Sequence, residues 1–184
     1  NEMSAKLLEN YLDYLDPRHN FFTQEDVDLF RKDYKETLDD YVMLRDISPA
    51  IKIYDTYKQR VKERVDFARK LLEKPTFTFD SDRTVDLKRE KLPWPKDKAA
   101  SDDLWSKLIE SEMLQEHMIE QAKLEKEAKK AKKKDEAKGD SSANSSEKKT
   151  EEPKKDKEED EKPEVRLVKD YERLQETIDK NTNE

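Results

Sequence analysis

A charged tract at residues 123–164 sets the strongest limit on what this chain of 184 residues can fold into. Its only large apolar residue is Leu124, and its fourteen lysines are balanced by fourteen acidic residues. A segment of this composition cannot bury enough apolar surface to offset the entropy lost on ordering it. We therefore expect three regions: an N-terminal helical domain at 1–122, a low-complexity charged linker or insertion at 123–163, and a helix at 164–184 that docks back onto the bundle. Within the insertion, the preceding helix is expected to continue for some turns past Lys123 as a solvated rod, and the tracts at 139–146 and 148–162 are expected to be disordered.

The residues outside this tract repeat apolar side chains in the pattern of amphipathic helices. In five segments they recur every three or four positions, which places them on one face of a helix. The five segments are 4–15, 24–43, 48–73, 101–119 and 165–178. We expect Ile51 to lie on the inward face of the third segment, and Leu108 and Leu114 on that of the fourth. The sequence therefore predicts a mainly all-α fold, an aromatic-rich bundle of about five helices.

One segment departs from the helical pattern. Phe77-Thr78-Phe79 alternates like a strand, residues 80–83 resemble a turn, and residues 84–87 have the composition of a returning strand. Two short strands alone are marginal and must lie on the helices to persist. If residues 76–88 adopt regular structure, we expect one short β-hairpin.

The two tryptophans of the chain lie close together in the sequence, and one of them stands between prolines. Each proline fixes its own φ and keeps the preceding residue out of the helical region, so Leu92 and Trp94 are held extended. Trp105 follows shortly after Ser101, whose hydroxyl can cap a new helix. We therefore expect residues 92–97 to cross the face of the bundle, with both indoles buried as structural anchors.

Composition disfavours an active site in this chain. Gly139 is its only glycine and lies in the charged tract, whereas phosphate-binding and oxyanion loops usually require glycine. No cysteine is present, so disulfides and thiolate metal sites are excluded. No apolar run approaches the roughly 20 residues of a membrane span, and no signal-type segment is present. We expect a piece of a longer polypeptide whose targeting signal lies elsewhere.

The histidines and a lysine run are the remaining candidates for chemistry. His19 and His117 lack a second histidine or an acidic residue at metal-ligand spacing, so both are interpreted as structural or surface residues. The basic run at 129–134 could neutralise phosphates, but no aromatic or arginine interleaves it and acidic residues follow. The sequence therefore predicts no catalytic, cofactor-binding or metal-binding residues, no cofactor and no nucleic-acid partner.

Two motifs resemble a known family. The first motif is Leu15-Asp16-Pro17-Arg18-His19-Asn20-Phe21-Phe22, which is followed by an acidic helix start. The second motif is Leu92-Pro93-Trp94-Pro95-Lys96-Asp97, which is followed by Asp103-Leu104-Trp105. This pattern resembles the N-terminal helical region of tail-specific proteases, the carboxy-terminal processing peptidases. The resemblance covers residues 1–122 and resumes at 165–184. The charged tract departs from the compact members and is interpreted as an insertion.

The resemblance implies a parent enzyme in the periplasm or cell envelope of a bacterium. In that family a PDZ domain captures substrate C-termini, a serine–lysine core cleaves them, and both lie downstream of this region. The resemblance makes these two domains, protein or peptide substrates and an adaptor protein the expected partners. No residue here matches the nucleophile, the general base or the oxyanion motif, so the region is expected to be a non-catalytic scaffold. The alternatives are a stand-alone helical interaction module or holdase with a flexible charged arm, and a structural spacer.

Overall fold

The computed structural model describes residues 2–73, 77, 79, 82–136 and 162–180. Within these residues the chain forms six α-helices and no strand, so the predicted all-α fold is confirmed. The helices are α1 (Glu2–Leu15), α2 (Gln24–Tyr34), α3 (Leu38–Met43), α4 (Ser48–Glu73), α5 (Lys98–Glu136) and α6 (Pro163–Lys180).

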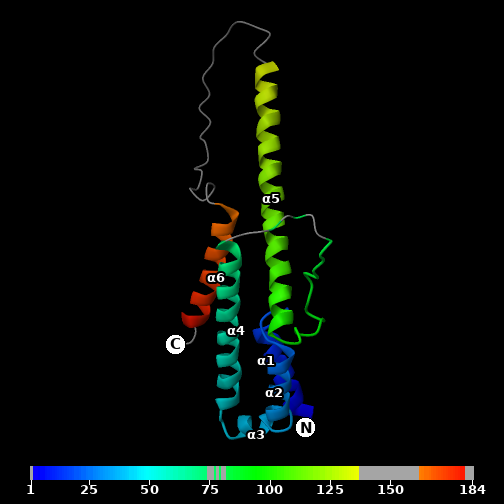
Figure 1. Cartoon of the computed structure of the whole chain (residues 1–184). Coiled ribbons are helices and arrows are strands. Elements are labelled where there is room, and N and C mark those ends of the chain that lie inside the picture. The colour runs from blue at the N-terminus through cyan, green and yellow to red at the C-terminus, as the bar shows by residue number, and fades with distance from the viewer. Residues whose placement is uncertain (1, 74–76, 78, 80–81, 137–161, 181–184) are drawn as a thin grey trace.

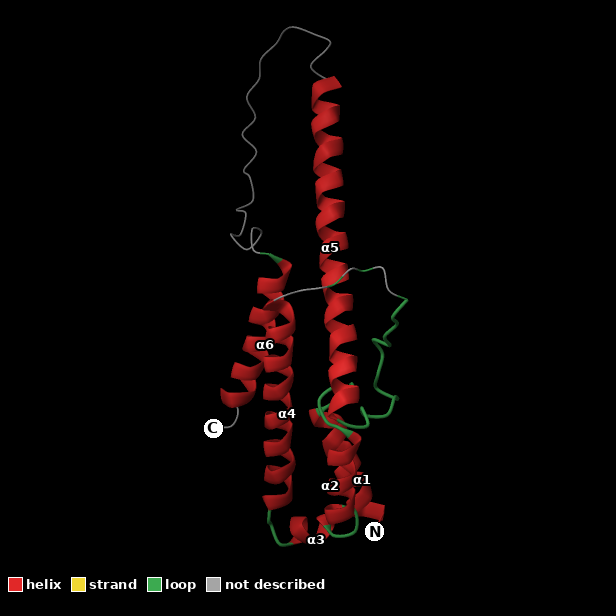
Figure 2. Cartoon of the chain, viewed as in Figure 1, coloured by secondary structure: helices red, strands yellow, loops and turns green. Residues whose placement is uncertain are grey.

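The long helices α4 and α5 run side by side, and α6 lies along α4 (Figure 1). The short helices α1, α2 and α3 gather at one end of the bundle, where α1 contacts both α2 and α3. Residues 82–97 form a loop, called the returning loop, that leads back to the start of α5, and the other end of α5 projects beyond the bundle (Figure 2). This arrangement brings the α1–α2 loop, the returning loop and the lower half of α5 together.

A local signal explains where α2 begins, whereas its early end involves a contact with α1. Thr23 and Asp26 form a capping box, in which each side chain accepts a hydrogen bond from the backbone N–H of the other. One helix was predicted over 24–43, but the structure breaks it into α2 and α3. Ser4 of α1 accepts the N–H of Asp39 at 2.9 Å and donates to its carboxylate, which fixes the start of α3 against α1. The break therefore results from a tertiary contact between α1 and α3, which the apolar periodicity of residues 24–43 does not indicate.

The described part of residues 76–88 contains no strand, and residues 76, 78, 80 and 81 lie outside the described residues. The described part is attached to the bundle by side-chain contacts, not by backbone hydrogen bonds between strands. Arg83 reaches α5, where it bonds to Glu110 at 3.0 Å and to Ser106 at 3.3 Å. The alternation that suggested strands does not produce backbone pairing in the residues that are described.

The core consists of two clusters that meet at the α1–α2 loop. Trp94 belongs to the first and is 7% exposed, and Trp105 belongs to the second and is 4% exposed, so the predicted burial of both indoles is confirmed. Phe21 packs against both clusters. The prediction for Ile51 and Leu114 is wrong, because these side chains are 51% and 38% exposed.

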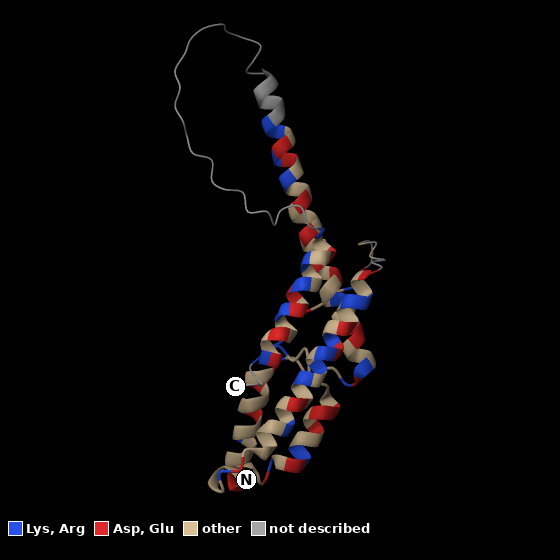
Figure 3. Ribbon diagram, turned by 90° about the vertical axis from the view of Figure 1, so that its left-hand side faces the viewer, with Lys and Arg blue, Asp and Glu red and all other residues tan. Residues whose placement is uncertain are grey.

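Helix α5 continues through the first part of the charged tract to Glu136. Lys, Glu and Ala are good helix formers, and charges of both signs follow one another along the projecting part (Figure 3). The side chains at 120–130 are exposed. Residues 137–161, which hold most of the predicted disordered insertion, lie outside the described residues. In the part of the chain that is described, no helix combines the length and apolar composition that crossing a membrane requires.

Candidate functional site beside the two tryptophans

The carboxylate of Asp16 organises the loop between α1 and α2. It is 1% exposed and accepts the backbone N–H groups of Asn20, Phe21 and Phe22 at 2.8, 3.0 and 3.1 Å. It also accepts the indole N–H of Trp94 at 3.1 Å. Burial raises the pKa of the Asp16 carboxyl above its usual value, although these hydrogen bonds act in the opposite direction. One side chain thus fixes both the loop and the indole that crosses it.

His19 completes this anchor around Trp94. Its backbone has a φ of 52°, a left-handed conformation that is uncommon for a residue other than glycine. The imidazole stacks on the indole with ring centroids 3.7 Å apart, and its Nδ1 lies 2.5 Å from the carbonyl oxygen of Leu92. Its Nε2 is 3.3 Å from a carboxylate oxygen of Asp13. Both ring nitrogens of His19 therefore serve the fold.

Trp105 joins the loop to α5 and α6. Its indole N–H donates to the carbonyl oxygen of Asn20 at 2.7 Å. Its ring lies 5.5 Å from the ring of Phe21 and 5.7 Å from that of Tyr171. Three segments that are distant in the sequence therefore meet at one indole.

A cavity of about 670 Å³ opens beside this contact, and we call it the clasp hollow. The α1–α2 loop, the returning loop, α5 and α6 all contribute to its walls. Its lining residues are Asp16, Pro17, Arg18, Asn20, Phe21, Leu87, Lys88, Glu90, Trp105, Leu108, Glu112, Gln115, Tyr171 and Leu174. Its size and mixed lining are typical of ligand sites in proteins.

Three polar side chains of the clasp hollow are notable. The phenol of Tyr171 donates to the carboxylate of Glu112 at 2.5 Å, which links α6 to α5. Burial raises the pKa of the Glu112 carboxyl, with a further increase from the charge of Asp170, against the opposing effect of the Tyr171 hydrogen bond. The Oδ1 atom of Asn20 is buried and has no hydrogen-bond partner among the described residues.

We expect Glu112→Gln to reduce the pH dependence of stability. Because the folded-state pKa of Glu112 is raised, its stabilising contribution is present below the ordinary carboxyl pKa and is lost as the pH rises through the raised value. The wild-type unfolding temperature should therefore fall, relative to that of Glu112→Gln, by a few degrees between about pH 4 and about pH 8. Thermal unfolding followed by circular dichroism measures this difference.

The control for this prediction is Glu120→Gln, at an exposed position on the same helix. This variant should follow the wild-type pH profile. Parallel profiles for the wild type and Glu112→Gln would show that the Glu112 carboxyl does not titrate differently in the folded and unfolded chains.

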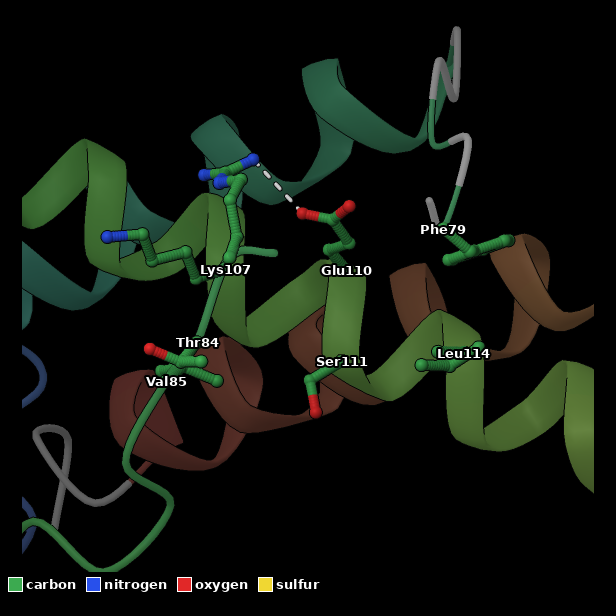
Figure 4. A pocket seen from close by; sticks show the side chains of 8 residues that line it. Phe79, Thr84, Val85, Lys107, Glu110, Ser111 and Leu114 are labelled. Atoms are coloured by element: carbon green, nitrogen blue, oxygen red, sulfur yellow. Dashed lines mark hydrogen bonds and ion pairs between the residues drawn. The ribbon is translucent and has the colours of Figure 1, made fainter. Parts of the chain in front are cut away.

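A second, smaller hollow of about 280 Å³ lies between the returning loop and α5 (Figure 4). One side of this hollow is formed by Thr84 and Val85. The other side is formed by four residues of α5, which are Lys107, Glu110, Ser111 and Leu114. The carboxylate of Glu110 is already paired with Arg83 at 3.0 Å.

The remaining sequence candidates lie away from this site. His117 is exposed on α5, where it stacks on Phe79 with centroids 6.1 Å apart and bonds to Gln121 at 3.0 Å. Lys129 is exposed and lies 3.6 Å from Glu125, and the side chains at 131–134 lie outside the described residues. Within the described ranges, no group of three or more His, Cys, Asp or Glu side chains could hold a metal ion.

Comparison with known proteins identifies relatives. The family model for the tail-specific protease N-terminal domain matches residues 1–184. The chain is 32% identical over 114 residues to the tail-specific protease of Haemophilus influenzae. That match covers 62% of this chain and 16% of the relative, so the chain corresponds to a small part of the relative's length.

Proposed function

Because this chain belongs to the family of tail-specific protease N-terminal domains, we propose that it is the non-catalytic scaffold region of such a protease. The parent enzyme is a serine–lysine peptidase of the bacterial periplasm that degrades or processes proteins from their C-terminus. In this proposal the helical bundle helps to enclose the path by which an unfolded tail reaches the catalytic site. A PDZ domain and the protease core in the same chain, protein substrates and an adaptor protein are its partners.

The observation that carries this proposal is the use of buried ionisable groups for structure. Asp16 bonds to backbone and indole N–H groups. Asp26 caps α2 and pairs with Arg60 at 2.8 Å. Arg64, which is 2% exposed, pairs with Asp102 at 2.6 Å. Groups engaged in this way stabilise helix ends and crossings, which supports a scaffold role.

We expect the isolated 184-residue chain to hydrolyse no peptide bond. The test incubates the purified chain, and separately the full-length protease, with an unfolded reporter protein and follows fragments by mass spectrometry. Cleavage by the full-length enzyme alone supports the proposal. Hydrolysis by the isolated chain would contradict it, and so would full activity in a protease from which this region has been deleted.

An exposed apolar tip favours a second candidate, a stand-alone interaction module or holdase. Met43 and Leu44 are 83% and 78% exposed, and Val42, Ile47 and Ile51 are also exposed around the turn from α3 to α4. A surface of this kind typically contacts another protein. The coding sequence after Glu184 separates the two candidates. Codons for a PDZ-like segment and a protease core support the scaffold, whereas an early stop codon supports the stand-alone module.

A further inference from the structure

Helix α6 is attached to the bundle by a small buried surface. Within α6, all of which the structure describes, one residue of eighteen is buried, Ile178, whereas α4 buries eight of its twenty-six. The side chains of Leu167, Val168, Tyr171 and Leu174 pack half-buried against the two core clusters. An element with so few buried apolar contacts opens at a lower free energy than the core on which it lies.

The ion pairs between α6 and its neighbours lie at the surface. Arg69 of α4 pairs with Glu172 of α6 at 2.9 Å, and Glu116 of α5 pairs with Arg166 of α6 at 3.1 Å. The four side chains are 31–44% exposed, so water and salt screen both pairs. These pairs therefore align α6 with the bundle but add little to the free energy of docking.

The hydrogen bond between Tyr171 and Glu112 is different, because it lies inside the interface between α5 and α6. The phenol donates to the carboxylate at 2.5 Å, and both residues are half-buried. Burial raises the pKa of the Glu112 carboxyl, Asp170 of α6 raises it further, and the bond from Tyr171 acts in the opposite direction. Burial is the largest of these effects, so the docked helix favours a protonated Glu112.

The other charged groups around Glu112 leave this preference in place. On its own helix, Glu116 is paired with Arg166, and on α4, Arg69 is paired with Glu172. The charged residues of the two loops that line the clasp hollow are balanced in sign, and they are Arg18, Lys88, Asp16 and Glu90. The charge that acts on Glu112 is that of an acid, Asp170.

We propose that α6 is a latch that opens from α4 and α5 while the rest of the bundle stays folded, and that the Tyr171–Glu112 bond is its pH-sensitive fastener. Opening uncovers the second core cluster, against which α6 packs. That cluster consists of Ala68, Leu72, Trp105, Ile109 and Met113. The inference is independent of the proposed protease function, because it concerns only the helices of this chain.

The sign of the pH effect follows from the raised pKa of Glu112. Its contribution to docking is fully present below the ordinary carboxyl pKa and is lost as the pH rises through the value of the docked state. The latch is therefore more often closed in acid and more often open at higher pH.

Hydrogen exchange of the 184-residue chain, followed by mass spectrometry of its peptides, tests whether α6 opens separately. At about pH 8 we expect the amides of α6 to be at least about tenfold less protected than the amides of α4 around Val61, which is fully buried. Equal protection of the two helices would overturn the inference, because α6 would then open only when the whole bundle unfolds.

Glu112→Gln tests the fastener, since the amide keeps an acceptor oxygen but cannot lose a proton. Comparing the wild type with this variant at one pH cancels the direct effect of pH on exchange. The ratio of α6 exchange rates, wild type over variant, should rise at least about threefold between about pH 5 and about pH 8. A ratio that is the same at both pH values would overturn the inference.

Tyr54→Phe is the matched control. The Tyr54 hydroxyl also joins α6 to the bundle, because it donates to the carbonyl oxygen of Ile178 at 3.3 Å, but this bond contains no carboxyl group. Its loss should speed α6 exchange by the same factor at both pH values. A pH-dependent factor of the same size as that of Glu112→Gln would overturn the role of Glu112 as the fastener.

A second variant keeps the test valid if Glu112→Gln does not fold. Tyr171→Phe removes the fastener but keeps an aromatic ring beside Trp105. At about pH 5 it should speed α6 exchange at least about fivefold, and it should change exchange around Val61 by less than about twofold. Equal acceleration in α4 and α6 would show that the bond supports the whole bundle, and it would overturn the latch.

Discussion

Replacing Trp94 with alanine will lower the free energy of unfolding by about 3–5 kcal/mol, the usual loss for a large buried aromatic side chain. The indole is 7% exposed and belongs to the first core cluster. It stacks on His19 and donates its N–H to Asp16. Alanine would leave a cavity in this cluster and a buried carboxylate with one hydrogen bond fewer. Urea unfolding followed by circular dichroism measures the change.

Two further variants show where this loss originates. Trp94→Phe keeps an aromatic ring against His19 but removes the N–H, and it should cost about 1–3 kcal/mol for the missing bond to a buried charged group. Met118→Ala, at a position on α5 that is 62% exposed, should change stability by less than about 0.5 kcal/mol. A loss below about 1 kcal/mol for Trp94→Ala would contradict a structural role and leave the indole available to a partner.

The helices were predictable because their signals are local. Apolar periodicity and the capping pair of Thr23 and Asp26 lie within a few residues of the elements that they specify. The break between α2 and α3 depends instead on Ser4 and Asp39, which are 35 positions apart. A contact of that kind leaves no trace in the local pattern, so one continuous helix was expected. For the same reason the sequence did not show that Ile51 and Leu114 face outward.

The candidate site was only partly predictable. The prolines around Trp94 indicated a rigid anchored crossing, and the structure confirms that the indole is buried. Asp16 directly follows the first predicted helical segment, 4–15, but its partner Trp94 lies 78 positions away. An aspartate that ends a helix and precedes a loop with free N–H groups is a usable signal, because such side chains often accept bonds from the following backbone. The clasp hollow needs four separate segments and therefore has no local signature.

The family was recognisable from the same residues that build the anchor. The motif at 15–22 contains Asp16 and His19, and the motif at 92–97 contains Trp94. The family model matches the full 184 residues, which confirms the resemblance. The structure gives the two motifs a shared physical purpose, because the side chains of the first hold the indole of the second.

Replacing Asp16 with alanine should destabilise the fold by about 3–5 kcal/mol, comparable to breaking a buried, hydrogen-bonded charge pair. Three backbone N–H groups and the indole N–H of Trp94 would lose their acceptor in a place that water reaches poorly. Each unsatisfied donor costs about 1–3 kcal/mol, but the loop can relax, so the costs will not add in full. The same urea titration measures the change.

Asp16→Asn is the matched variant, because it preserves shape and one acceptor oxygen. Three of the four bonds converge on Oδ2 of Asp16, so an amide oxygen in that place keeps most of them, and the loss should be about 1–2 kcal/mol. The double variant Asp16→Ala with Trp94→Ala should lose less than the sum of the two single variants, because both remove the same hydrogen bond. Strict additivity would mean that the two side chains act independently, and the anchor described here would not exist as one unit.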